Sequence, residues 1–167
     1  MSMTADIGRQ VIGIGGMAVC QGGAGIIITH ALGSCVGITL WCHQTHIGAM
    51  IHAQLPIAAK SPALAAERPG IFVDTGLALL LGEVIKRGAN RRSLRVCLVG
   101  GANVGGLTND LFNIGAKNVT IARKLLWQER LLLAGEETGG SIPRTIQLNF
   151  SNGSVTLSSG GISRPIG

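Results

Sequence analysis

The chain has 167 residues, which suits one domain able to bury about two-thirds of the surface that its unfolded form exposes. Hydrophobic residues make up 46% and charged residues 13%, so the composition excludes intrinsic disorder as a general description. The formal net charge is +6, but three Phe and two Trp are too few for stacking on bases, and we expect no nucleic-acid partner. The basic cluster Arg91, Arg92 and Arg95 is interpreted as a solvated turn, with mild attraction to an acidic protein as the alternative.

The sequence predicts neither secretion nor insertion into a membrane. The N-terminal stretch has one arginine, Arg9, and lacks the apolar core and cleavage site of a secretory signal. The most apolar stretch, 71–85, contains Asp74 and Glu83 and is too short to span a bilayer. The four cysteines form no Cys-x-x-Cys pair, which argues against a disulfide framework. We therefore expect a cytoplasmic protein.

The first half of the chain is predicted to be mainly extended. Strands are expected at 11–20, 26–29, 36–41 and 47–54. The pair Gly15-Gly16 suggests a bulge in the first strand, and the second strand ends at a Gly-Ser-Cys turn. The last two strands are expected to form a hairpin that carries Cys35 near one end and His52 near the other. Residues 55–70 contain three prolines and are interpreted as a loop.

Two amphipathic helices and four more strands are expected in the second half. Asp74 is the candidate cap of a helix that runs to residue 87 and ends at Gly88. Asn118 is predicted to cap the second helix, which runs to residue 130. Strands are expected at 94–99, 131–136, 144–150 and 153–157, the last two joined by a turn at 151–153. This order predicts an α/β fold, a single-domain sandwich of mixed β-sheet flanked by helices, with residues 1–9 and 159–167 frayed.

Cys35 and His52 form the constellation with the clearest chemistry. Cys35 follows Gly33 and Ser34 at a sharp turn that glycine permits, and His52 lies seventeen residues later on the next extended segment. Cysteine is a useful nucleophile as its thiolate, and a nearby imidazole is the commonest group that produces one near neutral pH. The pair suggests acyl chemistry at a carbonyl carbon, and the alternative is a cysteine that only packs.

The sequence around this pair resembles the CheD family, the bacterial chemoreceptor glutamine deamidases. The most specific blocks are Leu32-Gly33-Ser34-Cys35-Val36-Gly37 and His52-x-x-Leu55-Pro56. Three more blocks follow in the order of the family: Val99-Gly100-Gly101-Ala102, Asn113-Ile114-Gly115-Ala116-Lys117-Asn118, and Glu137-Thr138-Gly139-Gly140 with Arg144 shortly after. The resemblance spans residues 20–158, nearly the whole chain, and it implies an α/β sandwich.

The resemblance also implies a mechanism and its residues. Cys35 is the expected nucleophile, His52 the base, and Thr29 the third catalytic residue, six positions before the cysteine. The Cys35 thiolate attacks the carboxamide carbon of a glutamine side chain, releases ammonia and leaves a thioester that water hydrolyses to glutamate. From the residues themselves, backbone N–H groups of the tight turn around Ser34 and Cys35, which includes Gly33, are the candidate oxyanion donors.

The protein is thus expected to be a protein-glutamine glutaminase, an amidohydrolase. Its implied substrates are the cytoplasmic domains of methyl-accepting chemotaxis receptors, and a CheC-type phosphatase is a further implied partner. The alternative function is a non-catalytic adaptor that docks on receptors or on that phosphatase.

Two further motifs have competing interpretations. Gly100-Gly101-Ala102 forms either a wall of the substrate cleft or a close-packed turn, and a phosphate loop is excluded because its lysine and hydroxyl are missing. Arg144 is assigned to structure or to substrate docking, with neither preferred.

Cys42, His43 and His46 raise the alternative of a zinc site. Together with Cys35 and His52 they place five candidate ligands within eighteen residues. Their spacing matches no standard zinc finger, and neighbouring side chains on a strand diverge. We therefore expect no metal and no other cofactor. Trp41-Cys42 also replaces a Tyr-Asp-like pair common in the family, which places the substrate contacts implied for this loop in doubt.

Overall fold

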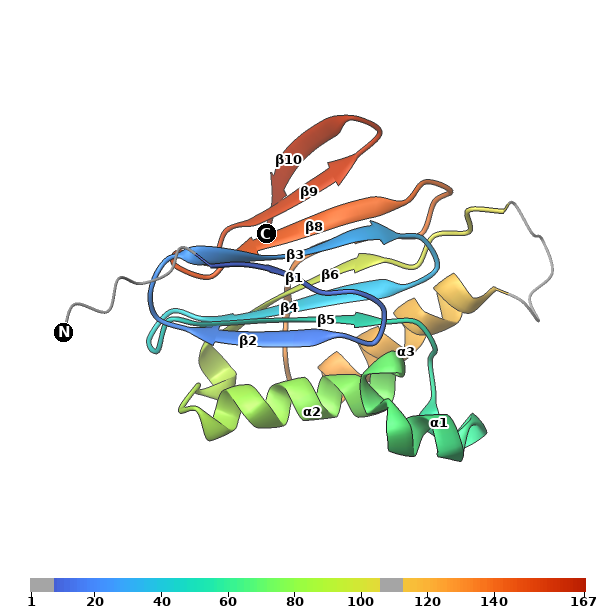
Figure 1. Cartoon of the computed structure of the whole chain (residues 1–167), viewed down its shortest axis with the longest axis horizontal. Helices are drawn as coiled ribbons and strands as arrows, with labels where there is room; N and C mark the ends of the chain where they lie inside the picture. Colours follow the sequence, from blue (N-terminus) through green and yellow to red (C-terminus); the bar gives the residue numbers. More distant parts are fainter. Residues whose placement is uncertain (1–7, 106–112) are drawn as a thin grey trace.

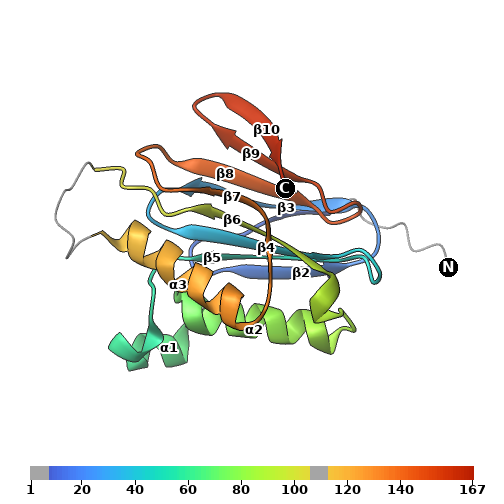
Figure 2. The same ribbon diagram turned by 180° about the vertical axis from the view of Figure 1, so that it is seen from behind.

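The computed structural model describes residues 8–105 and 113–167. Two five-stranded mixed sheets stack face to face (Figure 1). Helices α2 (Val73–Lys86) and α3 (Ile114–Gln128) cover one of the sheets on the face that points away from the other sheet. The view from behind shows the same layers, with α2 and α3 side by side beneath the strands (Figure 2). The predicted α/β sandwich of mixed sheet and helices is confirmed.

The two sheets are named here by their position relative to the helices. The helix-side sheet contains, in spatial order, β2 (Met17–Gln21), β5 (Ile47–Ala53), β4 (Val36–Cys42), β6 (Leu94–Gly100) and β7 (Leu133–Thr138). The outer sheet contains β1 (Gly8–Val11), β3 (Gly25–Leu32), β8 (Arg144–Asn149), β9 (Val155–Ser159) and β10 (Ile162–Ile166). Short helical segments lie at α1 (Pro62–Glu67), η1 (Ala58–Lys60), η2 (Pro69–Ile71) and η3 (Arg91–Ser93).

Strand β4 separates two apolar layers. All seven of its residues are buried, as expected for a central strand covered on both faces. Alternate side chains of β4, such as Ile38 and Leu40, pack with α2 and α3. Trp41 points the other way and packs between the two sheets. β4 pairs with β5 in antiparallel register, which confirms the predicted hairpin. Because β4 lies between β5 and β6, the hairpin is at the centre of the helix-side sheet.

The expectation of one strand over 11–20 is wrong. The segment divides into β1 and β2, which belong to different sheets. The glycines between them form the crossing, and Gly15 has a φ of 75°, which a side-chain-bearing residue rarely adopts. Gly15 N–H donates to the His52 carbonyl at 2.7 Å, and His52 N–H donates to the Gly16 carbonyl at 3.0 Å. The expected bulge is therefore an inter-sheet connection that holds the backbone of His52.

The start of α3 also differs from the prediction. The helix begins at Ile114 and is capped by the side chain of Asn113, which accepts a hydrogen bond from Ala116 N–H. Asn118 lies inside the helix and is fully buried. Glycine disfavours helix, but a Cβ on Gly115 would lie 2.5 Å from the Ala102 carbonyl oxygen. Close packing against the end of β6 thus requires glycine in the first turn.

Smaller differences concern the region from 55 to 88. The predicted loop at 55–70 contains α1 and two turns of 3-10 helix. Asp74 is not the cap of α2, because Phe72 holds that position, and the Asp74 carboxylate instead accepts hydrogen bonds from Ala58 N–H and Thr75 N–H. Gly88 ends this helical region with a φ of 100°, as predicted.

The tail at 159–167 is not frayed. Residues Ile162–Ile166 form β10, which pairs with β9 in antiparallel register, and Ile166 is buried. At the other end, residues 1–7 lie outside the described residues, whereas residues 8 and 9 belong to β1. Within the described ranges, none of the helices is long and apolar enough to cross a membrane.

Candidate active site

Thr29 and His52 connect the two sheets through a buried hydrogen bond. Thr29 lies on β3 of the outer sheet and His52 on β5 of the helix-side sheet, and both are buried. Thr29 Oγ1 lies 2.7 Å from His52 Nδ1 and 2.7 Å from the Ile12 carbonyl oxygen. The hydroxyl donates its single proton to that carbonyl, so Oγ1 must accept a proton from Nδ1–H. The contact fixes the tautomer of His52 and leaves the lone pair on Nε2.

Nε2 of His52 is buried and has no hydrogen-bond partner in the part of the chain that the structure describes. Buried acceptors are normally paired, so this one requires a functional explanation. Burial lowers the pKa of His52 below its ordinary value, which keeps the imidazole neutral at neutral pH. A neutral imidazole with an unpaired Nε2 is in the state required of a general base.

Cys35 lies immediately before β4, on the same face of the sheet as His52. Gly37 pairs with His52, and Cys35 precedes Gly37 by two residues, so the pleat directs both side chains toward the outer sheet. Diagonal neighbours of this kind lie about 7–8 Å apart between Cα atoms, within reach of a side-chain contact. The register therefore places Cys35 on the same face as His52, at the end of the space between the sheets where Thr29 lies, and within the described residues no hydrogen bond joins Sγ to Nε2.

The Cys35 thiol is nearly closed off from solvent, with 8% of the residue exposed. Burial raises its pKa above the ordinary value, and its own backbone N–H offsets part of that rise. Because burial disfavours the charged forms of both Cys35 and His52, it favours a neutral thiol and a neutral imidazole in the resting protein.

The turn at 33–35 is held through its carbonyl oxygens. The carbonyls of Gly33 and Cys35 accept hydrogen bonds from the N–H groups of Ala102 and Gly101, both at 2.8 Å. The Ser34 carbonyl accepts a hydrogen bond from the Asn118 side chain at 2.9 Å. The peptide bonds are trans, so the N–H of each peptide unit points opposite to its carbonyl. The N–H groups of Ser34 and Cys35 thus point away from β6 and α3, and they stay the candidate oxyanion donors.

Asn118 is a site residue that sequence reasoning missed. Its Nδ2 donates to the carbonyl of Ser34 at 2.9 Å and to the carbonyl of Gln54 at 2.8 Å. Ser34 precedes Cys35 directly, and Gln54 follows His52 by two residues. One buried amide therefore links the two segments that carry the thiol and the imidazole. The sequence signal was ambiguous, because Asn is also a preferred helix cap.

The expected cleft residues divide into two groups. Gly33, Ser34 and Ala102 line a hollow of about 440 Å³ whose other walls include Asn113 and Ile114 at the start of α3. Gly101 lines a neighbouring hollow. Gly100 has a packing role, because a Cβ there would lie 2.2 Å from the Cys35 carbonyl oxygen, and its φ is 111°. Gly100 is thus part of a close-packed turn, whereas a substrate cleft lined by Gly101 and Ala102 stays a prediction.

Arg144 supports the loop beside this wall. It is buried, and Nη1 donates to the Gly139 carbonyl at 2.7 Å. Gly139 N–H in turn donates to the Gly100 carbonyl, and Asn103 N–H donates to the Gly140 carbonyl. Arg144 also lines a separate hollow on the outer sheet. Its visible contacts are thus those of a structural residue.

The candidate zinc ligands do not converge. Cys42 is buried at the far end of β4, on the face that packs against the helices, whereas Cys35 and His52 face the outer sheet. The rings of His43 and His46 lie tilted to one another with centroids 6.1 Å apart, and His43 also contacts Trp41 edge to face. Among the described residues, no three His, Cys, Asp or Glu side chains are grouped closely enough to hold a metal ion.

Comparison with known proteins links this geometry to one family. A family model described as CheD chemotactic sensory transduction matches residues 54–159. A "Probable chemoreceptor glutamine deamidase CheD" from Pyrococcus horikoshii is 45% identical over 147 residues, which cover 87% of this chain and 89% of the relative. A relative of that name, numbered CheD 2, from Anaeromyxobacter dehalogenans is 38% identical and covers 89% of this chain and 93% of its own length. Another, CheD 1 from Syntrophus aciditrophicus, is 34% identical, with 93% and 96% covered.

Proposed function

The chain belongs to the CheD family, and from that premise we propose that it is a glutamine deamidase that acts on chemoreceptors. The observation that carries the chemistry is the Thr29–His52 hydrogen bond, which leaves Nε2 buried on the same side of the sheet as Cys35 and without a hydrogen-bond partner among the described residues. The free cysteines support a cytoplasmic location, where thiols stay reduced.

The proposed reaction has two halves that share one base. In the first, Nε2 of His52 removes the thiol proton while Cys35 Sγ attacks the carboxamide carbon of a glutamine side chain. The tetrahedral oxyanion is stabilised by N–H groups of the turn at Ser34 and Cys35. The imidazolium then protonates the amide nitrogen, the C–N bond breaks, and ammonia leaves behind a thioester.

In the second half, His52 removes a proton from water, and the resulting hydroxide attacks the thioester carbon. The C–S bond breaks, the proton returns to sulfur, and the product is a glutamate side chain. Thr29 keeps Nδ1 protonated through both halves, so that only Nε2 exchanges protons. One water is consumed and one ammonia is released for each glutamine converted.

Ammonia release from the cytoplasmic fragment of a chemoreceptor tests this proposal. We expect the unmodified protein to release ammonia and to convert specific glutamines to glutamate by peptide mass mapping. Cys35→Ser should abolish both signals, whereas Cys20→Ser, at a half-buried cysteine on β2, should leave them unchanged. Equal ammonia release by the protein and its Cys35→Ser variant would overturn the assignment. Receptor binding without any ammonia release would favour the adaptor function.

A further inference from the structure

The outward face of α3 is basic and carries an exposed tryptophan. The helix contains Lys117, Arg123 and Lys124 but no Asp or Glu. Trp127 is 79% exposed, although a tryptophan gains more than most residues from burial. Arg123 bonds to Glu136, so its charge is locally compensated. Exposed tryptophan beside cationic side chains is typical of protein-binding surfaces, where Trp and Arg are enriched.

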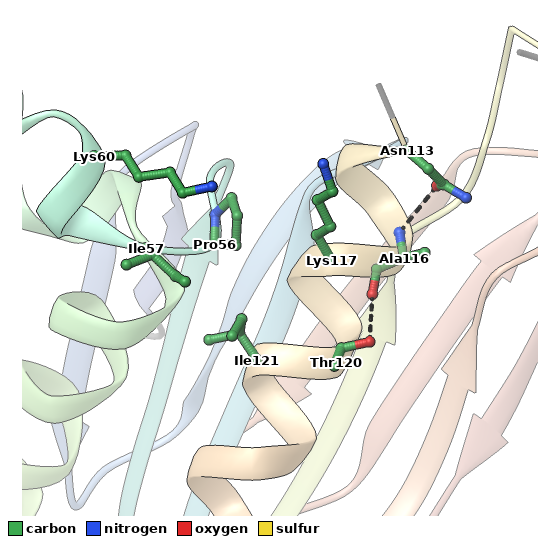
Figure 3. Close-up of a pocket in the computed structure, with 8 residues that line it drawn as sticks. All are labelled: Pro56, Ile57, Lys60, Asn113, Ala116, Lys117, Thr120 and Ile121. Carbon is green, nitrogen blue, oxygen red and sulfur yellow. Dashed lines mark hydrogen bonds between the residues drawn. The ribbon is translucent and has the colours of Figure 1, made fainter. Parts of the chain in front are cut away.

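A hollow of about 330 Å³ extends this face toward the segment after His52. Its apolar lining comes from Pro56, Ile57 and Ile121, and Lys60 and Lys117 stand on opposite sides of it (Figure 3). Apolar contacts between flanking ammonium groups match an amphipathic helix whose edges carry carboxylates. Charge alone is enough to bind a free anion, whereas this apolar lining also favours a ligand that carries apolar side chains.

This surface is continuous with the candidate active site. Asn113 lines both this hollow and the one beside Gly33 and Ser34. Lys117 precedes Asn118, whose side chain bonds to the Ser34 carbonyl. From Lys117 to Trp127 the helix rises by about 15 Å, or roughly three turns. A helix lying along α3 therefore has one end at the turn that carries Cys35.

We propose that Lys60, Lys117, Lys124 and Trp127, here called the α3 surface, dock an acidic helical segment of the chemoreceptor substrate. The inference rests on the proposed function and adds to it the surface that selects the substrate. The charge of the chain supports this occupant, since a net charge of +6 attracts an acidic partner. Docking holds the receptor while one of its glutamines enters beside Cys35, so the surface acts on binding and leaves the chemical step unchanged.

Steady-state kinetics with a chemoreceptor cytoplasmic fragment test the proposal. We expect the Lys60→Glu, Lys124→Glu double variant to raise KM by about tenfold or more, and Trp127→Ala to raise it several-fold, with kcat within about twofold of the original. These side chains are exposed, so the variants should keep the original unfolding temperature. Raising the salt concentration should increase the KM of the original protein more than that of the double variant.

Matched controls lie on the outer sheet. Arg9→Glu reverses a charge on β1, and Ile162→Ala removes an apolar side chain that is 70% exposed on β10. Both should leave KM unchanged. The rate at which iodoacetamide alkylates Cys35 should be the same in every variant, which reports an intact site.

The outcomes separate the two proposals. Unchanged KM in the α3-surface variants, or a fall in kcat alone, would overturn the docking surface while deamidation by the original protein stands. A similar rise in KM in the outer-sheet controls would also overturn it. If the original protein releases no ammonia from the fragment, the proposed function fails first, and the docking inference fails with it.

Discussion

At the scale of single residues, the hydroxyl of Thr29 determines which nitrogen of His52 is basic. The hydroxyl donates its proton to the Ile12 carbonyl, so its oxygen can only accept a hydrogen bond from Nδ1–H of His52. Without that acceptor, the imidazole could carry its proton on Nε2 and lose its function as a base toward Cys35. In the proposed mechanism, Thr29 therefore orients His52 and selects its tautomer.

Thr29→Val tests this role, because valine matches threonine in shape and lacks the hydroxyl. We expect deamidation to fall by about tenfold, the value of one neutral hydrogen bond, whereas His52→Ala should cost about 10²–10⁴-fold because both halves of the reaction need the base. Thr29→Ser should restore most of the rate. Thr39→Val is the matched control, since it removes a buried hydroxyl that bonds to Cys97 outside the site. A Thr29→Val rate equal to that of Thr39→Val would contradict the role given to Thr29.

The pH dependence of the rate follows from the pKa directions. The reaction needs neutral His52, and burial lowers the pKa of His52, so the neutral form persists to a pH below 6.5. As the pH falls through that lowered pKa, the imidazole gains a proton and the rate declines. Burial raises the pKa of Cys35, so the thiol stays protonated across neutral pH. We expect kcat/KM to be level across neutral pH, with an acid midpoint below 6.5. An acid midpoint at or above 6.5 would count against a buried His52 as the base.

Alkylation of the thiols provides a test that needs no substrate. Burial alone would raise the pKa of Cys42, but the polar groups around it, Thr45 first among them, lower it, and Cys42 is fully enclosed and beyond the reach of reagents. Burial raises the pKa of Cys20, which is half-buried and serves as an internal reference. With limiting iodoacetamide at neutral pH, we expect Cys35 to react first, because His52 accepts its proton.

The dependence of alkylation on the base is the decisive comparison. In His52→Ala, the reaction of Cys35 should slow by about tenfold or more relative to Cys20, as expected when a general base is removed. Peptide mass mapping measures the ratio of Cys35 to Cys20 labelling. An unchanged ratio in His52→Ala would contradict the role of His52 as the base for Cys35.

At the scale of elements, α3 supports the site through Asn118. The side chain bonds to the chain before Cys35 and to the chain after His52, so it fixes the separation of the two segments. Asn118→Asp keeps the shape but replaces the donor by an oxygen that faces two carbonyl oxygens. We expect this variant to lose at least about tenfold in kcat, and Asn118→Leu to lose activity as well, because two buried carbonyls are left without a donor.

A control on the same helix separates positioning from stability. Leu126→Ala removes a buried side chain of α3 remote from the turn, at a cost of about 2–5 kcal/mol. If Asn118 positions the pair, its variants should shift the pH profile and slow the alkylation of Cys35 while the folded Leu126→Ala protein shows neither change. Equal pH profiles and alkylation rates in the Asn118 variants and in Leu126→Ala would mean that Asn118 contributes only to stability.

The comparison of sequence and structure is most instructive at this scale. The hairpin of β4 and β5 was predictable because its β-branched runs and polar turn are local signals. The crossing at Gly15 and Gly16 was not, since the pairing partner of those glycines is the backbone of His52, far along the chain. The first turn of α3 was hidden by Gly115, a residue that local propensity excludes from helices and that packing against Ala102 requires. Contacts distant in sequence thus decided what local patterns could not.

The same distinction applies to the candidate site. Thr29, Cys35 and His52 could be selected because their residue types carry chemistry and their spacing matches a family. Gly100 could be assigned to the region but not to its task, which depends on a 2.2 Å approach of a hypothetical Cβ to the Cys35 carbonyl oxygen. Such a role exists only once the strands are placed side by side.

At the scale of the whole molecule, the last strand connects the edges of the two sheets. β10 is the edge of the outer sheet, and β7 is the edge of the helix-side sheet. Arg164 of β10 forms an ion pair with Glu137 of β7. A Cβ on Gly135 of β7 would meet the backbone of Gly167 at 2.7 Å, so the chain end packs directly on that edge. β10 and the residue after it thus cover part of the β7 edge, which would otherwise be open for pairing.

Ile166→Ala and Ile162→Ala test whether this strand is part of the folded core. Ile166 is buried in the layer between the sheets, so its truncation should lower the free energy of unfolding by about 2 kcal/mol or more, whereas Ile162 is 70% exposed and should lower it by less than about 0.5 kcal/mol. Urea unfolding measures both values. A strand that frays, as its polar and glycine-rich sequence suggests, would give equally small losses at both positions. Since the site lies at the Cys35 turn, both variants should keep their deamidation rate below the unfolding transition, which separates the stability of the sandwich from its chemistry.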